Sequence, residues 1–159
     1  MAASFSTAVY IESPPAVVFE ALGNLETAGQ WMPNFVRIEK LTPGPAGLST
    51  EWRETRKMFG KESTEHFKVT RFERPSRIDL LIDGSKGSSG RGEYVFVFEV
   101  VPERSGSNVE LTGEIRMPGI WALFARFMAG TFKKACHKDL EALKKHLESP
   151  WPATGRQRD

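Results

Sequence analysis

The middle of the chain alternates polar and apolar residues with a period of two across five successive segments, 48–58, 62–71, 77–83, 93–101 and 108–117. Successive side chains of a β-strand point to opposite faces, so this pattern predicts an antiparallel sheet with one wet face and one covered face. In the first segment, every second residue from Ser49 to Lys57 is polar, whereas Trp52 and Met58 fall on the opposite face. Such a sheet needs a large element to cover its apolar side.

Only one segment of the sequence is long enough to provide that cover. From 119 to about 147, apolar residues recur at helical spacing. At ~1.5 Å per residue this helix would span roughly 44 Å, whereas a domain of this length has a radius of gyration of only ~15 Å. The helix must therefore cross the whole sheet, with a facing stripe formed by Trp121, Ala125, Met128, Phe132, Cys136, Leu140, Leu143 and Leu147.

The remaining elements complete an α+β fold in a single domain. We expect a strand, two short helices and another strand before the alternating segments, at 5–12, 16–22, 25–31 and 35–41. The 159 residues suit one domain, which we place at 1–148. The tail at 149–159 carries two prolines and scattered charges, and we expect it to be disordered.

Charge and cysteine content narrow the function classes. The formal net charge is +2 and acids and bases interleave, so we expect no nucleic-acid partner, which would favour a concentrated basic stripe. The single cysteine, Cys136, permits no intrachain disulfide and fits a reducing compartment. The first twelve residues show no signal-peptide pattern, and no apolar run approaches the ~20 residues of a membrane span. We therefore expect a cytoplasmic protein without a transmembrane segment.

We expect neither a metal site nor a cofactor. His66, His137 and His146 lack the spacing of metal ligands, and surface positions are the favoured interpretation for all three. No nucleophile motif or Cys/His cluster appears. The glycine-rich stretch 84–92 lacks the spacing of a phosphate-binding loop, so we interpret it as a connection between strands.

Five parts of the sequence follow a recognisable order, namely 11–19 (IESPPAVVF), Trp31, 52–56 (WRETR), 72–77 (FERPSR) and 139–144 (DLEALK). Together they resemble the START-like, or helix-grip, superfamily (also known as SRPBCC), and within it the polyketide cyclase/dehydrase and lipid-transport branch. The resemblance covers roughly 5–148. It implies a curved seven-stranded sheet gripping the last helix around a deep cavity. Its members range from lipid carriers to cyclases and hydrolase-activator domains, so the fold alone does not fix the chemistry.

Glu54 and Arg56 are the leading candidates for catalysis. Because the other face of their strand is entirely polar, both should lie on the covered face beside Trp52. A buried charge is costly unless it is paired, and Glu65 and Arg71 on the next strand are the expected partners. Three interpretations stay open: binding of a polar head group, a general acid or base role for Glu54, and a structural ion-pair network or a wet strand end.

A larger set of mostly apolar side chains is expected to line the cavity, as in other ligand sites. Its members are Trp31, Trp52, Glu54, Arg56, Met58, Phe59, Phe67, Arg71, Leu80, Tyr94, Phe96, Phe124, Phe127 and Met128. For most of the aromatic members, simply filling the core is the favoured interpretation. Met58 and Phe59 differ because they precede Gly60 at a predicted hairpin tip, which suggests a rim or gate.

The segment 120–128 is apolar nearly all round and is followed by Lys133, Lys134 and Lys138. One side should meet the sheet, and the other should face the cavity or a partner subunit, which raises the expectation of a homodimer. Transient contact with a membrane surface is the alternative.

The leading functional hypothesis is a carrier or sensor that binds a small hydrophobic molecule, either a lipid or a polyketide-like metabolite, in an internal cavity. A second hypothesis is a cyclase or dehydratase that uses Glu54, Arg56 and Tyr94. A third is a protein-interaction domain whose cavity is incidental. The sequence does not name the ligand.

Overall fold

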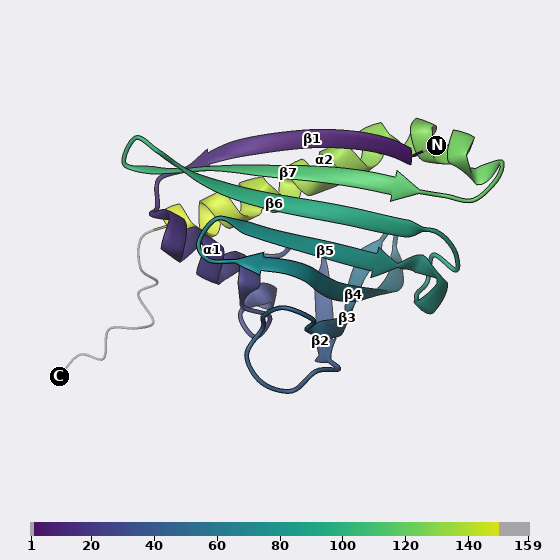
Figure 1. The fold of residues 1–159 in the computed structure, drawn as a ribbon, viewed down its shortest axis with the longest axis horizontal. Helices are drawn as coiled ribbons and strands as arrows, with labels where there is room; N and C mark the ends of the chain where they lie inside the picture. The colour runs from purple at the N-terminus through teal and green to yellow at the C-terminus, as the bar shows by residue number, and fades with distance from the viewer. Residues whose placement is uncertain (1, 150–159) are drawn as a thin grey trace.

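The computed structural model describes residues 2–149 as one strongly curved antiparallel sheet and a long helix (Figure 1). The seven strands are arranged in the order β1-β7-β6-β5-β4-β3-β2. In chain order the elements are β1 (Ala2–Ile11), α1 (Pro15–Gly23), η1 (Ala28–Gln30), β2 (Phe35–Lys40), β3 (Glu51–Met58), β4 (Lys61–Glu73), β5 (Arg77–Asp83), η2 (Gly84–Lys86), β6 (Glu93–Glu103), β7 (Gly106–Arg116) and α2 (Trp121–Glu148). The predicted α+β fold is confirmed, whereas residues 150–159 of the predicted tail lie outside the described residues.

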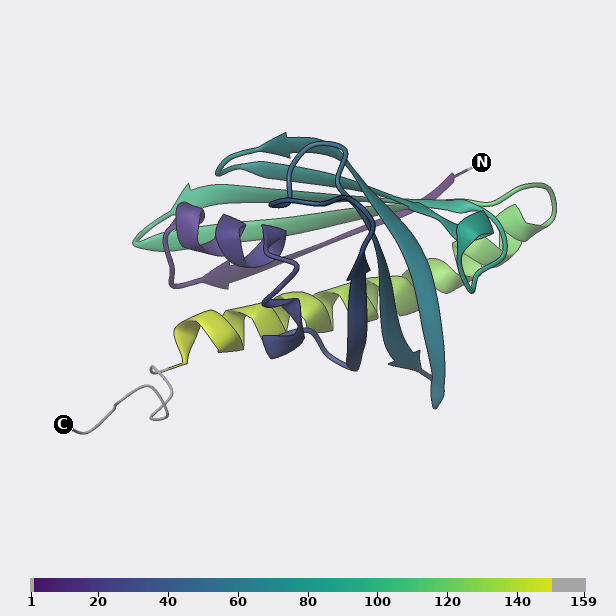
Figure 2. The ribbon, with the colours of Figure 1, turned by 90° about the horizontal axis from the view of Figure 1, so that it is seen from below.

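Helix α2 crosses the concave side of the sheet, and β2, β3 and β4 curl toward its middle (Figure 2). Its main packing partner is β1, at the other edge of the sheet. The 28 residues of α2 agree with the length expected from the apolar stripe. None of the helices within residues 2–149 is both long and apolar enough to cross a membrane.

Two apolar clusters hold the layers together. The first joins α2 to β1 and β7, and includes Ile11, Val109 and Leu143, each with no exposed surface. The second lies under α1, where Phe19 packs edge-on against Phe72 with ring centroids 5.1 Å apart. Leu140 of the first cluster and Trp52, Val69 and Ile78 of the second surround the cavity described below.

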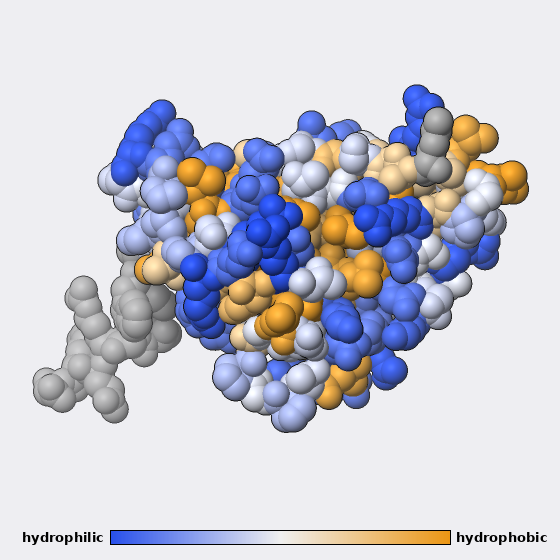
Figure 3. All heavy atoms as spheres, in the orientation of Figure 1, coloured by the Kyte–Doolittle hydropathy of each residue, from blue (hydrophilic) through white to orange (hydrophobic). Residues whose placement is uncertain are grey.

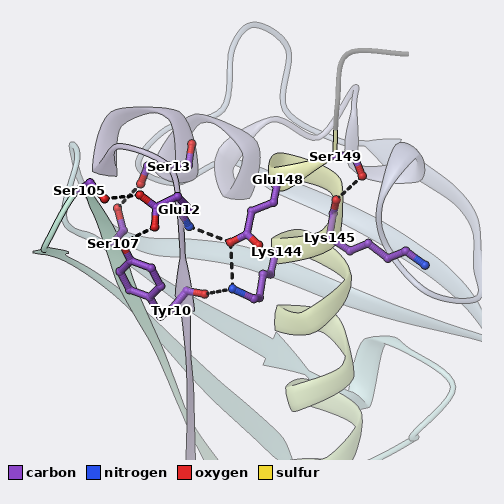
Figure 4. A network of polar contacts seen from close by, with 9 residues as sticks. All are labelled: Tyr10, Glu12, Ser13, Ser105, Ser107, Lys144, Lys145, Glu148 and Ser149. Atoms are coloured by element: carbon purple, nitrogen blue, oxygen red, sulfur yellow. Dashed lines mark hydrogen bonds and ion pairs between the residues drawn. The ribbon is translucent and has the colours of Figure 1, made fainter. Parts of the chain in front are cut away.

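A network of polar contacts fixes the C-terminal end of α2 to the end of β1 (Figure 4). Lys144 Nζ donates a hydrogen bond to the carbonyl oxygen of Tyr10 (2.6 Å) and lies 2.9 Å from the Glu148 carboxylate. Glu148 in turn accepts a hydrogen bond from the backbone N–H of Glu12 (2.8 Å). This end of the helix is therefore held by two of its own side chains, which bind backbone groups at the end of β1 and just after it.

Three details differ from the sequence-based expectations. The second short helix is only a single 3₁₀ turn, η1, which ends just before Trp31. His66 is buried rather than on the surface, and its Nε2 lies 3.2 Å from a Glu51 carboxylate oxygen. The pairing of β4 with β5 shifts register between Val69 and Arg71, and such a bulge reverses the faces of the residues that follow.

Candidate functional site

A cavity of about 200 Å³ lies between the concave face of the sheet, α1 and the middle of α2. This is far more than the ~10–15 Å³ that admits one water molecule, so it is a true cavity and not a packing defect. Most of its wall is apolar, with Phe67 stacked on Trp52 in nearly parallel rings whose centroids are 5.2 Å apart. Side chains of β3, β4, β5, β6 and α2 contribute to the wall because their inward faces converge there.

One side of the cavity carries an ion network centred on Arg56. Its Nε donates a hydrogen bond to Glu54 (2.7 Å), and its Nη1 donates to both carboxylate oxygens of Asp139 at 2.9 and 3.0 Å. Glu54 lies next to the indole nitrogen of Trp52 at 3.4 Å. The network thus joins β3 to α2, and one guanidinium faces two carboxylates.

Burial and charge act against each other in this network. Burial by itself would lower the pKa of Arg56, but the charges of Glu54 and Asp139 outweigh it and the pKa is raised. The pKa of Asp139 is raised by burial, which Arg56 only partly offsets. Burial also raises the pKa of the adjacent Cys136 thiol to about 12, with the charge of Asp139 acting in the same direction. Arg56 is therefore a fixed cation, whereas Asp139 holds a proton more readily than an exposed carboxyl does.

The carboxylate of Glu65 on β4 is a second polar group in the wall of the cavity. One of its oxygens accepts hydrogen bonds from the backbone N–H and the hydroxyl of Ser89, at 2.9 and 2.6 Å. The other oxygen is buried and has no hydrogen-bond partner among residues 2–149. Burial raises the pKa of this carboxyl, although the bonds from Ser89 oppose the rise. The indole N–H of Trp31, also on the wall, is likewise buried and unpaired within the described chain.

We place the mouth of the cavity between the end of β3 and α2. Met58 and Ala135 are the most exposed of the residues that form the wall, whereas the others are half-buried or buried. Met58 is the last residue of β3, and Ala135 lies in the middle of α2. A molecule entering the cavity would pass between these two elements.

Eight of the residues expected to line the cavity do so in the structure. Trp52, Glu54, Arg56 and Met58 all face inward from β3, as the polar alternation of that strand predicts. The others that line it are Trp31, Phe67, Leu80 and Phe96.

The other six predicted cavity residues lie elsewhere. After the β4 bulge, Arg71 turns outward and pairs with Glu73, and Phe72 takes the inward position. Tyr94 is buried beside Phe132 and donates a hydrogen bond to Ser89, so it lies behind the wall. The remaining four are Phe59, at the exposed hairpin tip, and Phe124, Phe127 and Met128, on parts of α2 that do not border the cavity.

Sequence reasoning missed Asp139 as a partner in this network. Glu65 and Arg71 were expected to supply partners for the charges of Glu54 and Arg56, but Arg56 pairs with Glu54 itself and with Asp139. A signal was present, since Asp139 lies three residues after Cys136 and four before Leu143, within the apolar stripe of the helix. An acidic residue in such a stripe indicates a buried cation opposite it.

The fold agrees with comparisons to known proteins. The sequence matches the family described as polyketide cyclase / dehydrase and lipid transport over residues 2–148. The chain belongs to this family. Among curated proteins no sequence match was found.

Solved structures of other proteins share the fold of this polyketide cyclase/dehydrase family member at low sequence identity. The Zhui aromatase/cyclase from Streptomyces sp. R1128 matches with a TM-score of 0.77 and 15% identity, over 98% of this chain and 99% of that one. Ara h 8.0201 matches with a TM-score of 0.75 and 18% identity, over 92% and 98% of the two chains. TTHA0849 from Thermus thermophilus matches with a TM-score of 0.73 and 18% identity, over 91% and 96%.

Proposed function

We propose that this family member binds a small, largely apolar molecule in the cavity, as a carrier or sensor. The observation that carries the proposal is a mostly apolar wall that presents a fixed cation, Arg56, and two unpaired polar atoms, on Trp31 and Glu65. Buried polar atoms without partners are costly, and a ligand could supply the missing hydrogen bonds. A wall with a few placed polar groups is typical of ligand sites.

Size and polarity restrict the ligand. The cavity holds about 200 Å³, less than the ~300–1,000 Å³ typical of ligand pockets. A compact ring system would fit inside, and a longer molecule would extend through the mouth beside Met58 and Ala135. The Trp31 N–H needs an acceptor, so a carbonyl or hydroxyl oxygen is expected on the enclosed part of the ligand.

Ligand binding is tested by narrowing the mouth. Ala135→Trp adds a large side chain at an exposed rim position, and Lys145→Trp is the matched control on an exposed part of the same helix. Native mass spectrometry of the gently purified protein, followed by titration with a fatty acid and with an anthraquinone, gives the readout. We expect Ala135→Trp to weaken binding by about tenfold or more, with the control unchanged. Absence of binding by wild type, or equal binding by both variants, would contradict the proposal.

A second candidate function is a cyclase or dehydratase acting on a polyketide-like substrate. It is favoured by Arg56, which can stabilise a developing oxyanion, and by the Asp139 and Glu65 carboxyls, whose raised pKa values suit proton donation. Incubation with a poly-β-ketone thioester analogue distinguishes the two functions. Product formation that is lost in Arg56→Met while binding persists would indicate the enzyme, and binding without turnover would indicate the carrier.

A further inference from the structure

The first two turns of α2 and the residue before them expose large apolar side chains. Ile120, Leu123 and Phe127 are 81%, 73% and 83% exposed, and Phe124 is also on the surface. These four positions share the helix face opposite Ala125, which is buried against the sheet. Figure 3 shows hydrophobic atoms gathered at the end of the molecule where α2 begins. We call Ile120, Leu123, Phe124 and Phe127 the apolar patch.

The charges near the apolar patch are of one sign. From Trp121 to Lys138, α2 contains four basic residues and no acidic one, the basic ones being Arg126, Lys133, Lys134 and Lys138. All four are exposed, and none forms an ion pair with another residue of the described chain. Lys134 and Lys138 continue the solvent-facing side on which Leu123 and Phe127 lie. An apolar patch thus continues into a strip of uncompensated positive charge.

The β5–β6 connection brings another basic side chain to the start of α2. It carries Arg91, whose guanidinium lies 4.1 Å from the centre of the Trp121 ring at the start of α2. Its neighbour Ser89 binds Glu65 of β4.

We propose that this apolar patch, with its basic strip, docks onto the surface of an anionic lipid membrane. Apolar side chains can insert at the boundary between head groups and acyl chains, while lysines beside them attract anionic lipids. A second copy of the chain fits less well, because it would offer its own apolar patch but no acidic residue of 121–138 to complement the basic strip. The inference does not rest on ligand binding, since it concerns the outer surface.

Vesicle flotation tests this docking with two matched sets of variants. Leu123→Ser with Phe127→Ser removes apolar surface, and Val101→Ser, at an exposed valine of β6, is its control. Lys134→Gln with Lys138→Gln removes two charges, and Lys68→Gln with Lys145→Gln removes the same number at exposed positions elsewhere. Each protein is mixed with vesicles of pure phosphatidylcholine or of phosphatidylcholine with phosphatidylserine. Light scattering reports the oligomeric state of each free protein.

We expect wild type to float with the anionic vesicles only, and both patch variants to lose about tenfold or more of this binding while the controls keep it. Raising the salt from about 0.1 M to about 0.5 M should weaken binding, because screening shortens the reach of the lysine charges. Ala135→Trp, which narrows the cavity mouth, should still float. No flotation, equal binding to neutral vesicles, or a wild-type dimer that the Leu123→Ser and Phe127→Ser pair dissociates would overturn the proposal.

Discussion

The two halves of α2 follow one apolar stripe but have different surroundings. From Asp139 onward the helix carries both acids and bases, and Leu140 and Leu143 are buried. Its Lys144 binds the backbone of Tyr10 in β1, and its Glu148 binds the backbone of Glu12 just after that strand (Figure 4). Before Asp139 the charges are all positive, and Leu123 and Phe127 are exposed. Helical periodicity alone therefore does not tell an anchoring half from one that is free to meet another surface. Asp139 lies at the boundary, where it ties the helix to β3 through Arg56.

The largest expected effect comes from the same substitution made in each half. Leu143→Ala removes a side chain with no exposed surface and should lower the free energy of unfolding by about 2–5 kcal/mol. Leu123→Ala should change it by less than about 0.5 kcal/mol, because that side chain already contacts water. Urea denaturation of both variants gives the comparison. Equal losses would show that the N-terminal half is packed as firmly as the C-terminal half.

Breaking the ion network around Asp139 should lower the free energy of unfolding by somewhat less than Leu143→Ala does. Arg56→Met leaves Glu54 and Asp139 without their cation, and because the arginine side chain is 23% exposed we expect a loss of about 2 kcal/mol, below the range for fully buried pairs. Glu54→Gln should cost less, because Asp139 still pairs with Arg56. The double variant should lose less than the sum of the two. Its ligand preference should also shift toward less polar molecules.

A double-mutant cycle by chemical denaturation measures this coupling. Val101→Ser serves as a reference for a substitution outside the network. Additive effects near zero, with ligand preference unchanged, would mean that water already satisfies the two charges.

Two glutamates at opposite ends of the molecule should respond to pH in opposite directions. The pKa of Glu148 is lowered by the backbone N–H of Glu12 and then by Lys144, so its contribution to stability is present above about pH 4.5 and is lost as the pH falls through its folded-state pKa. The pKa of Glu65 is raised by burial, so stability falls as the pH rises from about 4.5 through its folded-state pKa.

The measurement is the free energy of unfolding at about pH 4 and about pH 7 for Glu148→Gln and Glu65→Gln. Relative to wild type, Glu148→Gln should lower the free energy of unfolding more at about pH 7 than at about pH 4. Glu65→Gln should change it more favourably at about pH 7 than at about pH 4. Parallel changes in both variants would contradict the assignment of Glu65 to a poorly hydrated site.

The smallest expected effect is at the β3–β4 tip. Phe59 and Gly60 both have positive φ angles, 51° and 77°, a turn geometry that favours asparagine followed by glycine. Because Phe59 is exposed and its conformation is unfavourable for a bulky side chain, Phe59→Asn should raise the melting temperature by about 1–2 °C. Calorimetry detects a change of this size, and a lower melting temperature would show that Phe59 packs against the body of the protein.

The fold could be predicted from the sequence further than the site could. The alternation in 48–58 correctly predicted that Trp52, Glu54 and Arg56 face inward, because a strand offers only two faces. The same rule failed for Arg71, because a register shift within β4 reverses the faces and nothing local in the sequence signals it. The place of Asp139 within the apolar stripe hints at a buried charge, but its partner lies 83 residues away, and which cation it meets depends on tertiary packing.

The buried thiol of Cys136 is a natural chemical probe of access to the cavity. It is the only cysteine of the chain, and it borders the cavity. With its pKa raised to about 12, mainly by burial, it stays protonated at neutral pH and reacts slowly with alkylating reagents, since the thiolate is the reactive form. A reagent such as iodoacetamide must also pass the mouth to reach it. If the cavity binds a ligand as proposed, adding that ligand should slow the alkylation, and no engineered label is needed to follow it.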